Sequence, residues 1–237
     1  MFQYPCSLRN TFRSLSLSTV ESLIFQKKGG YCFDHAQLFA SVLKEKGFDF
    51  TFRMGRVGPD GPITHLVLLV SVDADTFLVD PGFGSGPMVP LPLNGTIVED
   101  LGFHYRILLN QETGNFTLER KDGDLWKSLY EIYNAPVKKA DVQVGHFITS
   151  SFPGSIFKNG LMVGIFRDDK HEMLTHKNLI VHQNGKIKVN PMLPNQIIKK
   201  LPDFKIHLDK DESSKLHRTL QLLSNQNSFF EWNFSGK

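Results

Sequence analysis

Two consecutive glycines stand immediately before a cysteine in the stretch Gly29-Gly30-Tyr31-Cys32-Phe33-Asp34, and a helical pattern follows directly. Glycine lets the backbone turn sharply and lets a ligand approach it closely. From Phe33 to Gly47, apolar residues recur at spacings of three and four, which predicts an amphipathic helix that Gly47 ends. A thiolate in the first turn of such a helix is stabilised by free backbone N–H groups and by the helix dipole. Cys32 is therefore the candidate nucleophile.

The composition limits the classes of protein to which this nucleophile can belong. The 237 residues are 41% hydrophobic and 22% charged, as in a globular chain with a sizeable core. The net charge of +3 is too small to indicate nucleic acid binding. No apolar run reaches the length of a membrane span, and residues 1–20 lack the core of a signal peptide. Only Cys6 and Cys32 are present, so we expect no disulfide framework and a reducing, cytoplasmic setting.

Strand-like patterns follow the predicted cysteine helix. Residues 48–57 alternate between apolar and polar side chains, and the Gly-Pro-Asp-Gly-Pro segment at 58–62 can only form a loop. Apolar runs at 65–72 and 76–80, joined by the polar residues 73–75, predict an antiparallel hairpin. Later patterns predict strands at 105–109, 116–120, 126–133, 161–166 and 178–182, the first three as a meander that continues into a barrel.

Three further helices are expected from apolar periodicity. One runs over 18–27, capped by Ser18, and one over 211–223 with three aligned leucines. The third runs over 136–151. Its predicted apolar face consists of Ala140, Val144, Phe147 and Ile148.

The predicted hairpin places a histidine and an aspartate close to one another. His65 opens the first strand and Asp80 closes the second, so in an antiparallel pair both lie at the same open end. If that end faces the start of the Cys32 helix, the three side chains form a Cys-His-Asp constellation. The histidine would take the thiol proton, and the aspartate would fix the histidine tautomer and stabilise the imidazolium.

Other histidines are weaker candidates. His35 is a rival base three residues after Cys32, but it lies along the helix surface, and only Asp34 is near enough to orient it. His171 and His176 are five residues apart, which does not match one helix face. No HExxH or Cys-x-x-Cys motif is present, so we predict no metal site.

Three stretches resemble, in order and spacing, the motifs of the arylamine N-acetyltransferase family. They are Gly-Gly-Tyr-Cys-Phe-Asp at 29–34, Thr-His-Leu at 64–66, and Val-Asp-Pro-Gly-Phe-Gly at 79–84. Residues 151–163 are similar to a further family segment, Ser-x-x-Pro-x-Ser-x-Phe, which leads into a strand. The resemblance covers most of residues 25–185.

The resemblance implies an α+β fold with a cysteine-protease-like core. A helical segment at 1–47 would carry the nucleophile, an antiparallel β-barrel domain would span 48–150, and an α/β lid domain would span 151–237. The family has a longer segment before its cysteine, so we expect most of a helical first domain to be absent from this sequence. The apolar face of the cysteine helix would then be exposed.

The resemblance also implies an activity, that of a cytoplasmic acyltransferase of xenobiotic metabolism. In the family's ping-pong reaction, acetyl-CoA acetylates the cysteine, CoA leaves, and the nitrogen of an arylamine or arylhydrazine attacks the thioester. Carried over, Cys32 bears the acyl group, His65 transfers protons and Asp80 orients the histidine. The implied partners are CoA and a small aromatic amine or hydrazine, without metal, nucleic acid or membrane; homo-oligomerisation stays open.

The binding residues implied by the resemblance lie close to the same motifs. Gly61 and Pro62 match the family region near the CoA site, and Thr64 flanks the acceptor pocket. Phe33 and Phe83 would form pocket walls.

Two residues depart from the family pattern. Lys28 stands where the family usually has arginine and Asp34 where it has glutamate, and lysine lacks the bidentate fork of arginine. Two alternatives to the acetyltransferase stay open. One is a cysteine hydrolase or amide synthase with the same triad, and the other is a truncated, inactive homologue.

Overall fold

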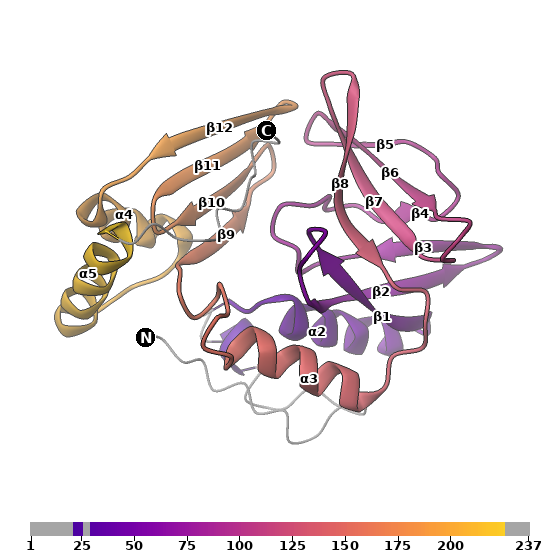
Figure 1. Ribbon diagram of the computed structural model, residues 1–237, viewed down its shortest axis with the longest axis horizontal. Helices are drawn as coiled ribbons and strands as arrows, with labels where there is room; N and C mark the ends of the chain where they lie inside the picture. Colours follow the sequence, from indigo (N-terminus) through magenta and orange to yellow (C-terminus); the bar gives the residue numbers. More distant parts are fainter. Residues whose placement is uncertain (1–20, 26–28, 226–237) are drawn as a thin grey trace. The chain divides into compact units, whose positions relative to one another are not determined.

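The computed structural model describes residues 21–25 and 29–225 (Figure 1). These residues fall into two compact units, which divide after Ile148. Most of the helix predicted at 18–27 lies outside the described residues, and within it Glu21–Phe25 (η1) forms one π-helical turn. Across both described ranges, no helix combines the length and the hydropathy that crossing a membrane requires.

The first unit is built on one eight-stranded antiparallel sheet that curls into a nearly closed barrel. Its strand order is β4-β3-β2-β1-β8-β7-β6-β5. The strands are β1 Asp49–Val57, β2 Ile63–Val72, β3 Asp75–Val79, β4 Leu91–Pro92, β5 Val98–Asp100, β6 Phe103–Leu109, β7 Phe116–Asp122 and β8 Leu125–Ile132. The predicted hairpin is confirmed, since β2 and β3 pair antiparallel with Leu68 opposite Val79 and Val72 opposite Asp75. The centre of β2 is buried, and on one face of the sheet its residues Leu66, Leu68 and Val70 belong to an apolar core cluster.

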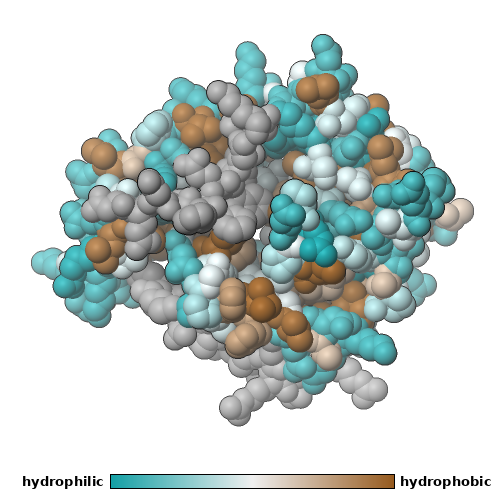
Figure 2. All heavy atoms as spheres, in the orientation of Figure 1, coloured by the Kyte–Doolittle hydropathy of each residue, from teal (hydrophilic) through white to brown (hydrophobic). Residues whose placement is uncertain are grey.

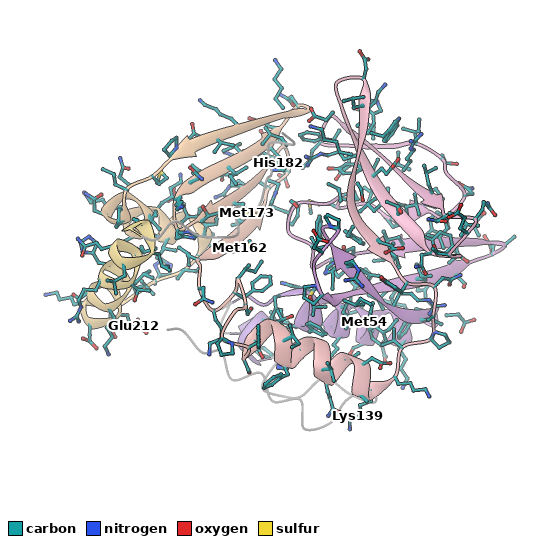
Figure 3. The ribbon with its side chains drawn as sticks, in the orientation of Figure 1. Met54, Lys139, Met162, Met173, His182 and Glu212 are labelled. Carbon is teal, nitrogen blue, oxygen red and sulfur yellow. The ribbon has the colours of Figure 1, made fainter. Side chains whose placement is uncertain are left out.

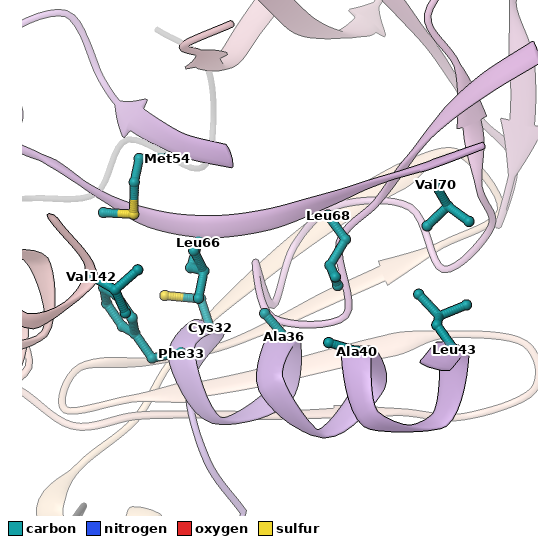
Figure 4. Close-up of a cluster of buried hydrophobic side chains, with 10 residues drawn as sticks. All are labelled: Cys32, Phe33, Ala36, Ala40, Leu43, Met54, Leu66, Leu68, Val70 and Val142. Carbon is teal, nitrogen blue, oxygen red and sulfur yellow. The ribbon is translucent and has the colours of Figure 1, made fainter. Parts of the chain in front are cut away.

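Among the described residues of this unit, α2 (Cys32–Glu45) and most of α3 (Lys139–Ser150) are the α-helices. Helix α2 begins at the cysteine, as predicted, and Gly47 follows it with a φ of +79°, a conformation that favours glycine. One face of α2 packs on β1 and β2 (Figure 4). The buried cluster there consists of Cys32, Phe33, Ala36, Ala40, Leu43, Met54, Leu66, Leu68, Val70 and Val142. Burial of this apolar face stabilises the helix far more than its intrinsic propensity does.

The outward side of α2 still carries apolar side chains. Phe39 is 37% exposed and Val42 is 49% exposed, and Phe48, just after the helix, is 43% exposed. The expected exposure of the apolar face therefore holds only in part, since Phe39 and Val42 are exposed while Leu43 is buried in the core cluster.

Helix α3 packs with a different face from the one predicted. Val144 and Phe147 are 63% and 57% exposed, and Figure 2 shows hydrophobic side chains on the surface over this helix. Val142 and His146 are buried instead. The predicted apolar face is therefore wrong. Gly145 explains which face of α3 is buried, because the absence of a side chain lets this side of the helix approach Met54 and Phe33 closely.

The second unit contains a four-stranded antiparallel sheet in the order β12-β11-β10-β9. Figure 3 labels Met173 and His182 on two adjacent strands of this sheet. The elements are β9 Met162–Phe166, β10 His171–Thr175, β11 Asn178–Gln183, β12 Lys186–Pro191, α4 Pro194–Lys200, η2 Leu201–Phe204 and α5 Lys210–Asn225. A core of Leu174, Ile197, Leu201, Phe204 and Leu220 joins sheet and helices.

Candidate active site

Cys32 is the first residue of α2, and only 7% of its surface is exposed. The preceding residue, Tyr31, caps the helix with an extended backbone at φ −126° and ψ −173°. Its N–H donates to Oδ2 of Asp34 at 3.3 Å, which is half of a capping box. Asp34 therefore serves the helix start directly, whereas Lys28 lies outside the described residues. The Sγ of Cys32 lies 3.8 Å from the carbonyl oxygen of Thr64, at the start of β2.

The structure brings His65 and Asp80 together at the open end of the β2–β3 hairpin. The Nε2 of His65 lies 2.7 Å from Oδ2 of Asp80, and the two side chains are 5% and 3% exposed. With Nε2 donating to the carboxylate, Nδ1 is the ring nitrogen left to face the thiol of Cys32.

Burial alone would lower the pKa of His65, but its partners reverse this effect. The charge and hydrogen bond of Asp80, followed by the hydrogen bond and charge of Cys32, raise the pKa of His65 to about 10. The ring is therefore held as an imidazolium at neutral pH, between a carboxylate and a thiol group. Such a group can stabilise a thiolate and can return a proton to a leaving group.

Asp80 receives three donors within the barrel. Besides His65, the hydroxyl of Tyr130 donates to Oδ2 at 2.6 Å and the N–H of Gly82 donates to Oδ1 at 3.1 Å. Burial tends to raise the pKa of Asp80. The charge of His65 and these hydrogen bonds outweigh burial and hold the pKa below its usual range. The carboxylate is thus fixed in place and stays ionised.

Aromatic rings enclose the imidazole. The ring centroid of Tyr130 lies 4.9 Å from that of His65 in an edge-on arrangement, and the ring of Phe83 lies 5.3 Å away. Phe83 and Tyr130 also contact one another at 4.8 Å. These rings hold the imidazole in one orientation and keep its surroundings largely apolar.

The loop at 58–62 is held in place by the strand before it. The guanidinium of Arg56 donates from Nη1 to the carbonyl of Gly61, and from Nε to the hydroxyl of Tyr133 at 3.0 Å. The hydroxyl of Thr64 donates to the carbonyl of Pro62 at 3.4 Å. These hydrogen bonds fix the loop, and the chain continues from it directly into β2, which carries His65.

Phe33 is placed differently from the residues around His65. Its side chain is fully buried in the core cluster behind Cys32, where it contacts the rings of Tyr31 and His146. Phe83, by contrast, contacts the imidazole. The roles of both residues as pocket walls stay predictions.

The rival base His35 contacts the backbone before the helix. Its Nε2 lies 3.1 Å from the carbonyl oxygen of Gly30, in the turn before the helix. Among the residues that the structure describes, no group of three His, Cys, Asp or Glu side chains is arranged to hold a metal ion.

Tyr130 is the functional candidate that the sequence patterns did not reveal. It lies in β8, 50 residues beyond the aspartate to which it donates. Alternation along residues 125–132 marks it as an inward-facing barrel residue, but no local motif connects it with Asp80.

A cysteine at a helix start, facing an imidazole that a buried carboxylate orients, is the arrangement of enzymes with a cysteine nucleophile. The chain belongs to the arylamine N-acetyltransferase family. The family model described as N-acetyltransferase matches residues 7–213. The fold class expected from the sequence is thereby confirmed.

Curated and solved relatives agree with this family. The arylamine N-acetyltransferase of Mycolicibacterium smegmatis is 35% identical over 173 residues, which are 69% of this chain and 62% of that protein. The Mycobacterium tuberculosis protein of the same name is 32% identical over 175 residues, 70% of this chain and 62% of that one. This chain thus spans 62% of the length of both relatives.

The fold is similar to that of solved family members. The arylamine N-acetyltransferase from Mycobacterium abscessus superposes with a TM-score of 0.78 at 29% identity, covering 89% of this chain and 79% of that one. The Mycobacterium marinum protein, solved in complex with CoA, gives a TM-score of 0.78 at 29% identity, covering 87% and 80%.

Proposed function

We propose that this protein transfers an acetyl group from acetyl-CoA to the nitrogen of an aromatic amine or hydrazine, through an acetyl-Cys32 intermediate. Family membership supports this reaction. One observation carries it. The 2.7 Å contact between His65 and Asp80 fixes an imidazole that also hydrogen-bonds Cys32. This arrangement supports roles for Cys32 as nucleophile, His65 as proton-transfer group and Asp80 as orienting carboxylate.

In the first half-reaction, the Cys32 thiolate attacks the carbonyl carbon of acetyl-CoA. The bond between that carbon and the sulfur of CoA breaks, and the CoA thiolate takes a proton from the His65 imidazolium. The imidazole is then neutral, and Asp80 keeps its tautomer because Nε2–H still donates to the carboxylate.

In the second half-reaction, the amine nitrogen attacks the thioester of acetyl-Cys32. Neutral His65 accepts the proton that the nitrogen loses, and the Cys32 thiolate leaves as the amide forms. The thiolate–imidazolium pair is restored, so the cycle balances in protons without a further group. Two separate half-reactions on one thiol predict ping-pong kinetics.

We propose a binding position for each substrate from the residues that lie around Cys32 and His65. We place the acceptor ring beside Thr64 and Phe83, which lie next to Cys32 and His65. We propose that CoA binds beside Gly61 and Pro62. These residues lie on the loop that the guanidinium of Arg56 holds by its hydrogen bond to Gly61. The solved relative that contains CoA supports CoA as a substrate class. The low cysteine content supports a reducing, cytoplasmic setting.

Intact-mass measurement after mixing with acetyl-CoA tests the proposal directly. The wild-type protein should gain one acetyl group, which an added arylamine removes. Cys32→Ser should gain none, while Cys6→Ser should behave as wild type. An unmodified wild-type protein would contradict the proposal.

The alternative functions give different results in the same assay series. A hydrolase with these residues would cleave a peptide substrate without CoA, and an amide synthase would close an amide within one acyl substrate. An inactive homologue would show slow labelling of Cys32 by iodoacetamide near neutral pH.

A further inference from the structure

Helix α3 contacts the residue immediately before the cysteine. The hydroxyl of Tyr31 is hydrogen-bonded to Nδ1 of His146, and the two rings stack with centroids 5.7 Å apart and planes at 28°. Only 8% of His146 is exposed. Tyr31 is therefore held by its side chain to α3, and by its backbone to the first turn of α2 through Asp34 and His35.

The same part of α3 contacts the residue immediately after the cysteine. The ring of Phe33 meets that of His146 edge-on, with centroids 5.7 Å apart and planes at 76°. A methyl group on Gly145 would lie 3.0 Å from Cζ of Phe33 and 2.7 Å from Cε of Met54. Figure 4 shows Phe33, Met54 and Val142 gathered beside Cys32 in this core cluster. Residues on both sides of the thiol are thus packed against one short segment of α3.

We propose that Tyr31 and His146 act as a positioning pair, which fixes the start of α2 on α3 and thereby aims the thiol of Cys32 at His65. This proposal rests on the proposed acyl transfer through Cys32. In this role the pair acts through the backbone that it holds rather than on the reacting atoms.

The chemistry of the pair suits a fixed hydrogen bond. Burial lowers the pKa of His146 below its ordinary value, although the charge of Asp34 opposes this effect. A neutral imidazole can accept the tyrosine proton at Nδ1. The hydroxyl of Tyr31 is therefore satisfied in the interior, where an unpaired hydroxyl would be costly.

The pair can affect the reactivity of Cys32 because Tyr31 is its direct neighbour in the chain. Tyr31 is one peptide bond from Cys32, so a rotation of its backbone shifts the sulfur relative to the imidazole. A misplacement of about 1 Å at a reacting group can cost about a hundredfold in rate. A loosened cap should therefore slow the reactions of Cys32 while most of the barrel stays folded.

The test compares the wild-type protein with Tyr31→Phe, His146→Leu and the double variant. The readout is the second-order rate constant for alkylation of Cys32 by iodoacetamide between pH 5 and 9, about the range in which thiols and imidazoles titrate. Each single variant should react about tenfold more slowly at pH 7, and the double variant no more slowly than either single one.

A rescue and a control separate positioning from general stability. His146→Asn keeps a side-chain oxygen that can accept the tyrosine proton, and should recover most of the lost rate. Val144→Ala, on the exposed side of the same helix, should leave the rate unchanged. Unfolding midpoints measured in parallel show whether each variant is folded at the assay temperature.

Three outcomes would overturn the proposal. The first is a folded Tyr31→Phe variant that is alkylated at the wild-type rate. The second is a double variant in which the losses of the single variants add, and the third is a His146→Asn variant that reacts no faster than His146→Leu. Alkylation needs no acetyl-CoA, so its result is independent of whether the protein acetylates amines. A wild-type protein that alkylates rapidly but never acquires an acetyl group would contradict the proposed function alone.

Discussion

Gly82 lies so close to Cys32 that a methyl group on it would stand 2.4 Å from the Cα of Cys32 and 3.0 Å from its Cβ. The turn after β3 therefore runs directly against the first residue of α2. The N–H of Gly82 also donates to Asp80. One residue without a side chain thus holds the carboxylate and the cysteine helix at a fixed separation.

Substitution of Gly82 by alanine should force this turn and α2 apart. We expect a loss of about 1–3 kcal/mol in the free energy of unfolding, as for other overpacked sites. The rate of Cys32 acetylation should fall at least tenfold, about the effect of a sub-ångström misalignment. Urea denaturation and single-turnover acetylation measure the two effects. Wild-type behaviour in both would show that the turn adapts and that the close contact is unimportant.

Substitution of Tyr130 by phenylalanine should remove one of the three donors to Asp80 while keeping the ring. A hydrogen bond to a buried carboxylate contributes about 1.5–3 kcal/mol, and the loss should appear in urea denaturation at pH 7. The turnover number should also fall severalfold, because the carboxylate that orients His65 is held less firmly. Tyr105→Phe is the matched control, since Tyr105 is a buried barrel tyrosine that is hydrogen-bonded to Arg120 instead. Equal loss of activity in both variants would contradict a specific role for Tyr130.

Much of the candidate site follows from local sequence because its residues lie in or beside short, regular elements. The two glycines before Cys32 and the period of the following residues locate a helix start. The hairpin predicts that His65 and Asp80 share one end, since its turn at 73–75 fixes the register. Tyr130 and His146 could not be found in this way, because barrel closure and helix docking bring them near from distant parts of the chain.

Polar residues hide two strands of the second unit from the sequence pattern. Strand β12 contains Lys186 and Lys188 and lies at the edge of its sheet, where one side needs no apolar alternation. Strand β10 is buried but includes His171 and Glu172, whose polarity hides the strand pattern. In α3 the spacing of apolar residues predicts the wrong buried face. The helix instead packs on the side of Gly145, where the missing side chain lets it approach Met54 and Phe33 closely, and a hydrophobic pattern does not reveal this.

The His65–Asp80 pair should make stability depend on pH. Below pH 6.5 the imidazole binds its proton in the folded and the unfolded state, so the full stabilisation is present. It is lost as the pH rises from 6.5 through the folded pKa of about 10, because only the folded state keeps the proton. The pKa of Asp80 is lowered from 3.8, so its contribution is present above 3.8 and is lost as the pH falls through the folded value. Stability should therefore decline from pH 6.5 toward 10.

Asp80→Asn tests this origin of the pH dependence. Breaking the buried pair should cost about 3–5 kcal/mol near pH 6 and should flatten the decline between pH 6.5 and 10. His104→Gln is the control, because this half-exposed histidine lies 3.8 Å from a mostly exposed Glu99 and should contribute little. Urea denaturation across pH 5–10, about the range in which imidazoles titrate, measures all three proteins. An unaltered slope in Asp80→Asn would exclude the pair as the cause.

His171 in β10 should produce the opposite dependence. It is 2% exposed and stacks on Phe166 at 4.2 Å, and within residues 21–25 and 29–225 neither ring nitrogen has a hydrogen-bond partner. Burial, opposed by the charge of Glu172, lowers its pKa to about 4. The full stability is therefore present above pH 6.5 and is lost as the pH falls from 6.5 to about 4, because only the unfolded state takes up the proton.

Substitution of His171 by phenylalanine should remove this acid sensitivity. The ring stacking on Phe166 is kept and two buried polar atoms disappear, so stability at pH 7.5 should be unchanged or slightly higher. At pH 5 the variant should exceed the wild type by about 2 kcal/mol, the value that a shift of this size implies. Urea denaturation at both pH values measures the difference, with His207→Gln at an exposed position as the control. Equal acid sensitivity in His171→Phe and the wild type would show that another group is responsible.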